Sequence, residues 1–342
     1  MRVVIAPDSF KGSIDARDAA AAIADGWLSV RPGDEVLAIP QADGGEGTLD
    51  AIEAAVPAAQ RRPAGPVTGP DGRPVEADWL LLPDGTAVVE LARSSGIALM
   101  RELDPLGATT RGLGETIASA LAAGAHSVVI ALGSSASTDG GVGALEALDG
   151  VAPPAGGVRL LTDVTAPLLG PDGAAAVFGP QKGATPEDVA VLEERLRAWA
   201  ARFDADPSTP GAGAAGGTAF GFLAAWGASI LPGAPEIARL TGLTDALPAA
   251  DVLVTGEGRL DATSFTGKVV GHALRAATDA GTPRVVAIAG QVALDATSPL
   301  RGGLTSFSLT ELAGSPGAAM ADPAAWLRRA GEEAARAQLV AE

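Results

Sequence analysis

The chain has 342 residues and a formal net charge of −17, from 24 Lys and Arg against 41 Asp and Glu. This charge argues against nucleic acid or an anionic membrane surface as the main partner, because either would need a clustered basic face. Hydrophobic residues make up 47% and charged residues 19%, so the chain has enough apolar material to fold, and its length predicts two domains. The absence of Cys excludes disulfides and thiolate metal sites and favours a cytoplasmic location.

The chain begins with two strand, loop and helix units. The apolar run at 2–6 predicts a buried parallel strand, and the run at 35–39 predicts a second strand. Each run is followed by a polar loop, PDSFKGS or PQADGGEG, and then by a helix with one apolar face, such as Ala20, Ile23 and Trp27. This order is typical of a parallel sheet.

The pattern changes after about residue 63. Short extended runs at 75–79 and 86–91, separated by turn residues, predict antiparallel strands. A helix with Leu113 and Ile117 inward, a buried strand at 127–132, the loop GSSASTDGG and another helix follow, and a brief strand at 159–162 runs into DVTAPL. Thr185 followed by Pro-Glu-Asp predicts a well-capped helix start.

An uncharged stretch runs from 207 to 235. Its prolines and glycines leave only 218–231 as helix, which is too short to cross a bilayer. We therefore expect a buried core helix there and no membrane partner.

Strands return near the end of the chain, at 251–255, 284–289 and 304–309, before a closing helix. Two strand and helix units before the changed region and three after it predict a flavodoxin-like doubly wound parallel sheet domain, interrupted by a second, inserted α/β domain. We place the discontinuous domain at 1–62 and 241–342 and the inserted domain at 63–240. We expect the active site in the cleft between them.

Common nucleotide-binding and catalytic motifs are absent or out of context. No G-x-x-x-x-G-K-[ST] exists, and the literal G-x-G-x-x-G at 211–216 follows Pro-Ser-Thr-Pro rather than a strand, so we predict a loop there. With His126, His272 and no Cys, a His-based zinc site or a Ser-His-Asp triad is disfavoured.

Five polar, glycine-rich loops follow predicted strands: PDSFKGS, ADGGEGT, GSSASTDGG, TDVTAPLLG and TGEGRLD. Such loops lie at the carboxyl ends of the strands, which is the edge where parallel sheets bind ligands. Glycine lets the backbone approach a ligand there, and backbone N–H groups donate to phosphate oxygens. The loops also carry acids, which a Mg²⁺ ion shared with substrate phosphates would balance. Lysines, carboxylates and glycines together predict phosphoryl transfer. The acids are Asp8, Asp43, Glu46, Asp139, Asp163, Glu257 and Asp261.

The strings APDSFKGS, ADGGEGT, SSASTDGG, DVTAPLLGPDGAAAVFGPQKGAT, PGAGAAGG and TGEGRLDATSFTGK, in this order, resemble the glycerate kinase type 1 family over nearly the whole chain. The resemblance implies a cytoplasmic two-domain kinase that phosphorylates D-glycerate, usually to 2-phosphoglycerate, with ATP as co-substrate and Mg²⁺ as cofactor. It also implies a flavodoxin-like domain with an inserted second domain.

The resemblance also implies roles for residues. Asp163 would be the base that takes the acceptor proton, Lys11 would contact a phosphate or carboxylate, and Asp43 with Glu46 would hold the metal or substrate hydroxyls. Arg259 is the candidate clamp for the substrate carboxylate. The expected substrate and phosphate contacts are Asp8, Ser9, Ser13, Gly44, Gly45, Gly133, Ser134, Ser135, Asp139, Gly140, Gly141, Lys182, Glu257, Arg259, Asp261 and Lys268.

Two positions depart from the family pattern. Ser134 stands where the family loop has a second Gly, and Ala166 stands where the family has Asn; the segment between Leu148 and Arg159 is also shorter than in family members. These changes leave open a kinase for another small hydroxy acid or for the 3-hydroxyl of glycerate, and a ligand-binding or inactive paralogue with the same cleft. The oligomeric state also stays open, a homodimer included.

Overall fold

The computed structural model describes residues 1–266, 268–294 and 304–340, and it divides into two compact units. Unit 1 comprises Met1–Asp43, Asp50–Pro57 and Ala234–Glu342, and unit 2 comprises Gly44–Leu49 and Ala58–Gly233. Both units are therefore discontinuous in sequence. The boundaries near 58 and 234 differ by several residues from the expected ones near 63 and 241, and the short 44–49 segment of unit 2 was not expected.

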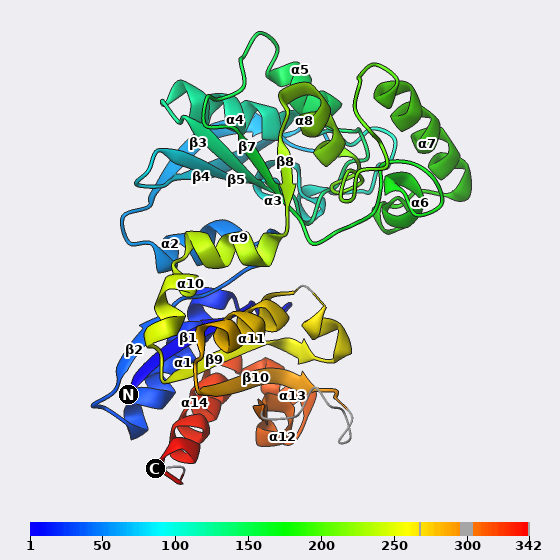
Figure 1. Ribbon diagram of the computed structural model, residues 1–342. Coiled ribbons are helices and arrows are strands. Elements are labelled where there is room, and N and C mark those ends of the chain that lie inside the picture. The colour runs from blue at the N-terminus through cyan, green and yellow to red at the C-terminus, as the bar shows by residue number, and fades with distance from the viewer. Residues whose placement is uncertain (267, 295–303, 341–342) are drawn as a thin grey trace. The chain divides into compact units, whose positions relative to one another are not determined.

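Unit 1 is built on one parallel sheet (Figure 1). Its strands are β1 (Arg2–Pro7), β2 (Glu35–Ala38), β9 (Val252–Leu260), β10 (Arg284–Val292) and β11 (Thr305–Ser308). The spatial order β11-β10-β9-β1-β2, with every pairing parallel, is the flavodoxin-like order. The predicted fold class is confirmed.

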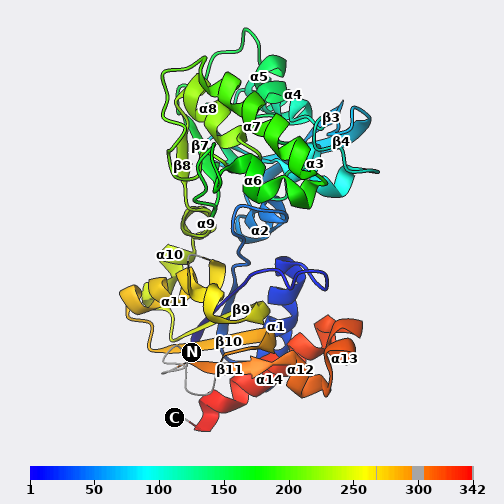
Figure 2. The ribbon, with the colours of Figure 1, turned by 90° about the vertical axis from the view of Figure 1, so that its right-hand side faces the viewer.

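Helices cover both faces of this sheet (Figure 2). One face of β1 packs through Val3 and Ile5 in a cluster with Trp27 and Leu327, from α1 (Ala16–Val30) and α14 (Pro323–Val340); α12 (Leu309–Ala313) and α13 (Pro316–Ala321) join this side. The next residue, Val4, packs in a cluster on the other face, with α9 (Gly233–Leu240), α10 (Leu243–Ala246), a 3₁₀ turn (Leu247–Ala249) and α11 (Val269–Ala280). Burial on both faces explains why the inner strands β1, β9 and β10 are apolar at consecutive positions, whereas the edge strands β2 and β11 are less buried.

Unit 2 contains a mixed sheet in the order β3-β4-β5-β6-β7-β8. The strands are β3 (Gln60–Thr68), β4 (Pro74–Leu81), β5 (Thr86–Glu90), β6 (Ser127–Ala131), β7 (Val158–Leu161) and β8 (Ser229–Leu231). As predicted for 75–79 and 86–91, β4 and β5 pair antiparallel, and β3 also pairs antiparallel with β4; β5 to β8 pair parallel. The carboxyl ends of β5, β6 and β7 therefore lie along one edge.

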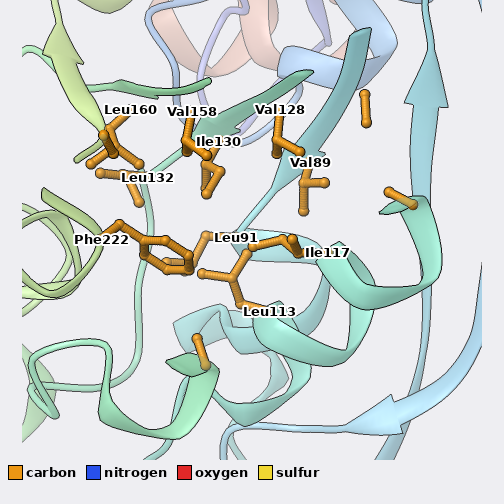
Figure 3. Packing of buried hydrophobic residues seen from close by; sticks show 14 of the residues in the cluster. Val89, Leu91, Leu113, Ile117, Val128, Ile130, Leu132, Val158, Leu160 and Phe222 are labelled. Carbon is orange, nitrogen blue, oxygen red and sulfur yellow. The ribbon is translucent and has the colours of Figure 1, made fainter. Parts of the chain in front are cut away.

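The core of unit 2 lies between its sheet and three helices. Val89, Ile130 and Leu160 point from the strands toward Leu113 and Phe222 (Figure 3). All five side chains are fully buried, and burial of each contributes about 1.5–3 kcal/mol to the stability of the fold. The helices of this unit are α3 (Ala92–Ser95), α4 (Arg111–Ala122), α5 (Val142–Ala147), α6 (Ala174–Phe178), α7 (Pro186–Ala200) and α8 (Thr218–Trp226), with 3₁₀ turns at Ile97–Leu99 and Pro180–Lys182.

Two sequence-based expectations for secondary structure are wrong. The helix predicted for 218–231 ends at Trp226, because Gly227 adopts a left-handed φ of 63°, and 229–231 instead pair with β7 as an edge strand. The string TGEGRLD is not a loop after a strand, since β9 continues to Leu260 and stays paired with β10. No helix in the described part of the chain is long and apolar enough to cross a membrane.

Candidate functional site

In unit 1, the loop after β1 is a tight turn. Phe10 and Ile14 close it with N–H···O=C bonds of 2.9 and 3.1 Å, and the Phe10 ring is buried in the core. Gly12, at the tip, has a left-handed φ of 75°, which glycine adopts without a steric cost. The turn thus presents Lys11 and Ser13 to solvent at the carboxyl end of β1.

Two acids of unit 1, Asp43 and Glu257, act on the carboxyl group of a third, Asp8. Burial, followed by the negative charges of Asp43 and Glu257, raises the pKa of Asp8 to about 7, although the Ser9 N–H donates to Asp8 Oδ1 at 2.6 Å. Burial also raises the pKa of Glu257, and the nearby Lys268 ammonium opposes this. Asp8 directly follows β1, Asp43 lies in the loop after β2, and Glu257 lies within β9. Like-charged carboxylates held this close favour an added cation.

Other expected ligand residues of unit 1 already have protein partners. Arg259 donates to Asp261 Oδ2 at 3.2 Å and to Gln291 Oε1 at 2.8 Å, and its side chain is 60% exposed. Asp261 accepts the N–H and hydroxyl of Thr263 and so caps the 3₁₀ turn at Ala262–Phe265. Lys268 is exposed, with its Nζ 3.4 Å from Thr263 Oγ1.

In unit 2, the acidic glycine loop lies against the end of β6. The Gly133 N–H donates to the Gly44 carbonyl at 3.1 Å, and a Cβ on Gly133 would lie 2.3 Å from the Gly45 Cα. Only glycine allows this approach of the two backbones. Glu46, at the exposed side of the loop, is open to solvent.

The serine-rich loop that follows Gly133 is held by its neighbours. Ser134 adopts a left-handed φ of 60°, where the family pattern has Gly, and its carbonyl accepts the Ile97 N–H at 2.8 Å. Ser135 is buried, with its Oγ accepting a hydrogen bond from Lys182. The loop is therefore a fixed surface at the carboxyl end of β6.

Lys182 lies beneath this loop and is only 3% exposed. Its Nζ donates to Ser135 Oγ at 2.8 Å and to the Ser137 carbonyl at 2.5 Å. Burial lowers the pKa of Lys182 to about 8, against the opposing effect of Asp139. In the structure Lys182 thus ties two parts of the loop together.

Asp139 has a structural role in the same loop. Its carboxylate accepts the Thr110 N–H and hydroxyl, at 2.9 and 2.8 Å, and the N–H groups of Gly141 and Gly143, at 3.1 and 3.3 Å. These donors lie at the starts of α4 and α5. Asp139 therefore occupies positions that a phosphate at the start of α5 would need.

Further contacts fix the rest of this region. Gly140 donates to the Gly216 carbonyl at 3.0 Å, and its own carbonyl accepts Trp199 Nε1 at 3.1 Å. Asp163, exposed after β7, accepts the Gly233 N–H at 3.0 Å through Oδ1. This bond orients the Asp163 carboxylate at the first residue of α9.

Sequence reasoning missed one buried acid at this edge. Glu90, the last residue of β5, is 2% exposed and accepts the N–H groups of Gly47 and Leu49 at 3.1 and 3.0 Å. The available signal was a single charged residue within the apolar run TAVVEL. Because a charged side chain is seldom buried unless it has partners, this position indicates a specific role.

The structure thus forms two groups of predicted site residues. Unit 1 brings Asp8, Lys11, Asp43 and Glu257 to one sheet edge, and unit 2 brings the 44–47 and 133–141 loops, Lys182 and Asp163 to another. That both groups serve one active site stays a prediction. Among the residues that the structure describes, no three Asp, Glu or His side chains form a ready-made metal site.

Comparisons with known proteins show which family the chain belongs to. The model of the glycerate kinase family matches residues 3–154 and 152–339. The chain is 37% identical to glycerate kinase from Bacillus subtilis, covering 90% of this chain and 89% of that one, and 37% identical to glycerate 2-kinase from Escherichia coli K12, covering 79% and 80%. A crystal structure assigned as glycerate kinase 2 from Salmonella typhimurium LT2 superposes with a TM-score of 0.83 at 32% identity, covering 100% and 99%. The chain is therefore a kinase that belongs to the glycerate kinase family.

Proposed function

We propose that the protein transfers the γ-phosphate of ATP to the 2-hydroxyl of D-glycerate, in the cytoplasm. The observation that carries the proposal is the placement of four of the family's loops after the parallel strands β1, β2, β6 and β7. Relatives named glycerate kinase and glycerate 2-kinase, similar over most of the chain, support both the reaction and the acceptor position.

The residues suit the steps of phosphoryl transfer. Such reactions depend on positioning, on neutralising the phosphate charge and on one base for the acceptor hydroxyl. We assign the base to Asp163, whose carboxylate the Gly233 N–H orients. Lys11, exposed on a closed turn, supplies a mobile positive charge for a phosphate or carboxylate.

Magnesium fits the acids of unit 1 by donor chemistry. Mg²⁺ is usually held by one or two carboxylates and by substrate phosphates, so a preformed cage of three acids is not required. Asp8, Asp43 and Glu257 offer oxygen ligands whose mutual repulsion a cation would relieve. When bound there, Mg²⁺ would neutralise phosphate charge. Glu46, the second metal ligand expected from sequence, belongs to the loop of unit 2.

The test is an assay of the purified protein with Mg-ATP and D-glycerate. We expect ADP release that depends on glycerate, and a product whose ³¹P and ¹H spectra are those of 2-phosphoglycerate. The Asp163→Asn variant should lose turnover by at least about a hundredfold while still binding ATP. Absence of glycerate-dependent ADP would refute the proposal, and 3-phosphoglycerate as product would refute the assigned position.

Two observations in unit 2 favour another small hydroxy acid as the substrate that accepts the phosphate. Ser134 places a hydroxymethyl group on the exposed side of the loop at the end of β6, and Ala166 removes an amide that the family pattern carries. Both changes alter which small hydroxy acid would fit. A panel of hydroxy acids in the same assay decides, because a higher kcat/KM for one of them than for D-glycerate would establish this alternative.

A further inference from the structure

The short segment Gly44–Leu49 packs with unit 2, although Asp43 before it and Asp50 after it belong to unit 1. Leu49 is buried, but Gly44, Gly45 and Gly47 have no side chain to pack, so burial alone fixes little of the segment before it. Specific contacts must therefore fix it. The segment contains Gly44, Gly45 and Glu46, three of the residues expected at the site.

The carboxylate of Glu90 provides two of these contacts. One oxygen accepts the Gly47 N–H at 3.1 Å, and the other accepts the Leu49 N–H at 3.0 Å. Leu49 lies in the first turn of α2 (Thr48–Ala55), where backbone N–H groups have no partner within the helix. Glu90 satisfies this donor from a strand that lies about forty residues away in sequence.

The chemistry of the contact requires a carboxylate. The Glu90 side chain is 1% exposed, and Arg93 Nε lies 3.8 Å from its Oε1. Burial of a charge is costly, so the position is favourable only because the charge accepts strong hydrogen bonds. Glutamine would keep one acceptor oxygen and would turn an N–H₂ donor toward a backbone N–H.

We propose that Glu90 is a positioning residue, which holds the Gly44–Leu49 segment against the end of β6 in the conformation that substrate binding needs. The contact between Gly44 and Gly133 then sets the position of the serine-rich loop relative to Glu46. The kinetic part of this inference rests on the proposed function, whereas the structural part does not.

The test compares Glu90→Gln with a matched control, Glu115→Gln. Glu115 also accepts a backbone N–H and a hydroxyl, both of Thr68, across a long sequence separation in unit 2, and its ion pair is with Arg111 on α4 rather than with a site loop. Hydrogen exchange of the 44–49 segment should accelerate about tenfold or more in Glu90→Gln, since one charge-assisted hydrogen bond is lost. The control should leave this exchange unchanged.

Kinetics provide the second readout. We expect kcat/KM for D-glycerate to fall about tenfold or more in Glu90→Gln and to change less than about twofold in Glu115→Gln. Unchanged exchange in Glu90→Gln overturns the proposal whatever the activity. Faster exchange with kcat/KM equal to that of the control also overturns it, because the position of the loop would then not matter.

Two further measurements keep the outcomes distinct. If the wild-type protein releases no ADP with glycerate, the proposed function fails, and the exchange data still decide whether Glu90 holds the segment. If Glu90→Gln does not fold, residue-resolved exchange in the wild-type protein decides instead. Protected amides at Gly47 and Leu49 are then expected, and unprotected ones refute the assignment.

Discussion

Removing the Asp139 carboxylate should destabilise unit 2 strongly. Asp139→Ala deletes the acceptor of four hydrogen bonds, two of which come from Thr110, a residue that is fully buried. Each buried donor left without a partner costs about 1–3 kcal/mol, so the two donors of Thr110 alone account for a loss of several kcal/mol. We therefore expect a loss of about 3–5 kcal/mol in the free energy of unfolding.

Urea unfolding followed by tryptophan fluorescence measures this loss. The matched control is Asp188→Ala, which removes an exposed acid from the capping box at the start of α7. We expect the control to lose much less, because its donors remain in contact with water. Equal unfolding free energies for the two variants, together with loss of substrate binding in Asp139→Ala only, would refute the structural role of Asp139.

Three further predictions concern single residues. Because the pKa of folded Asp8 is raised to about 7, protonated Asp8 contributes stability that is fully present below pH 4 and is lost as the pH rises through 7. Asp8→Asn should remove this pH dependence and raise the free energy of unfolding of the metal-free protein at pH 8 by about 2–4 kcal/mol. The urea midpoint measured against pH tests both expectations. Because the pKa of folded Lys182 is lowered to about 8, wild-type stability should rise between about pH 8 and 10.5, and this rise should be absent in Lys182→Met by the same measurement. Gly133→Ala would place a Cβ 2.3 Å from the Gly45 Cα and should lower the thermal midpoint, whereas Gly317→Ala, with nothing within 4 Å, should leave it unchanged or raise it.

The inner parallel strands of unit 1, β1, β9 and β10, were predictable because their burial on both faces requires consecutive apolar residues. The length of β9 was not. Gly256 and Gly258 resemble turn residues in sequence, but a Cβ on Gly256 would lie 2.2 Å from the Ile288 carbonyl oxygen, and one on Gly290 would lie 2.4 Å from that of Gly258. These glycines allow two paired strands to approach closely, which is a tertiary requirement that no local pattern reveals.

The division of the chain between the two units was predictable only in outline. The change from parallel to antiparallel patterning near residue 63 follows from turn residues, which act locally. The 44–49 segment has no local feature that says which sheet it packs on, because its place depends on Glu90 and Gly133, both distant in sequence. Long-range hydrogen bonds of this kind determine where one unit ends and the other begins, and composition alone does not predict them.

The acids of the loops show how far residue type alone determines a role. In sequence, Asp139, Asp261, Asp8 and Glu257 are alike, each an acid in a glycine-rich string. In the structure, Asp139 and Asp261 accept N–H and hydroxyl groups at the starts of helical turns, and hydrogen bonds from Thr263 lower the pKa of Asp261.

Asp8 and Glu257 have the opposite environment, since burial raises the pKa of each carboxyl group. The negative charges of Asp43 and Glu257 raise the pKa of Asp8 further. A carboxylate whose pKa is lowered by protein donors gains little from a cation, whereas one whose pKa is raised by burial and by neighbouring acids gains a favourable charge interaction when a cation binds. We therefore expect the cation proposed for unit 1 to be held by Asp8 and Glu257, with the negative charge of Asp43 acting on Asp8, rather than by Asp261. Because metal binding competes with protonation, cation affinity at this group should increase as the pH rises through 7.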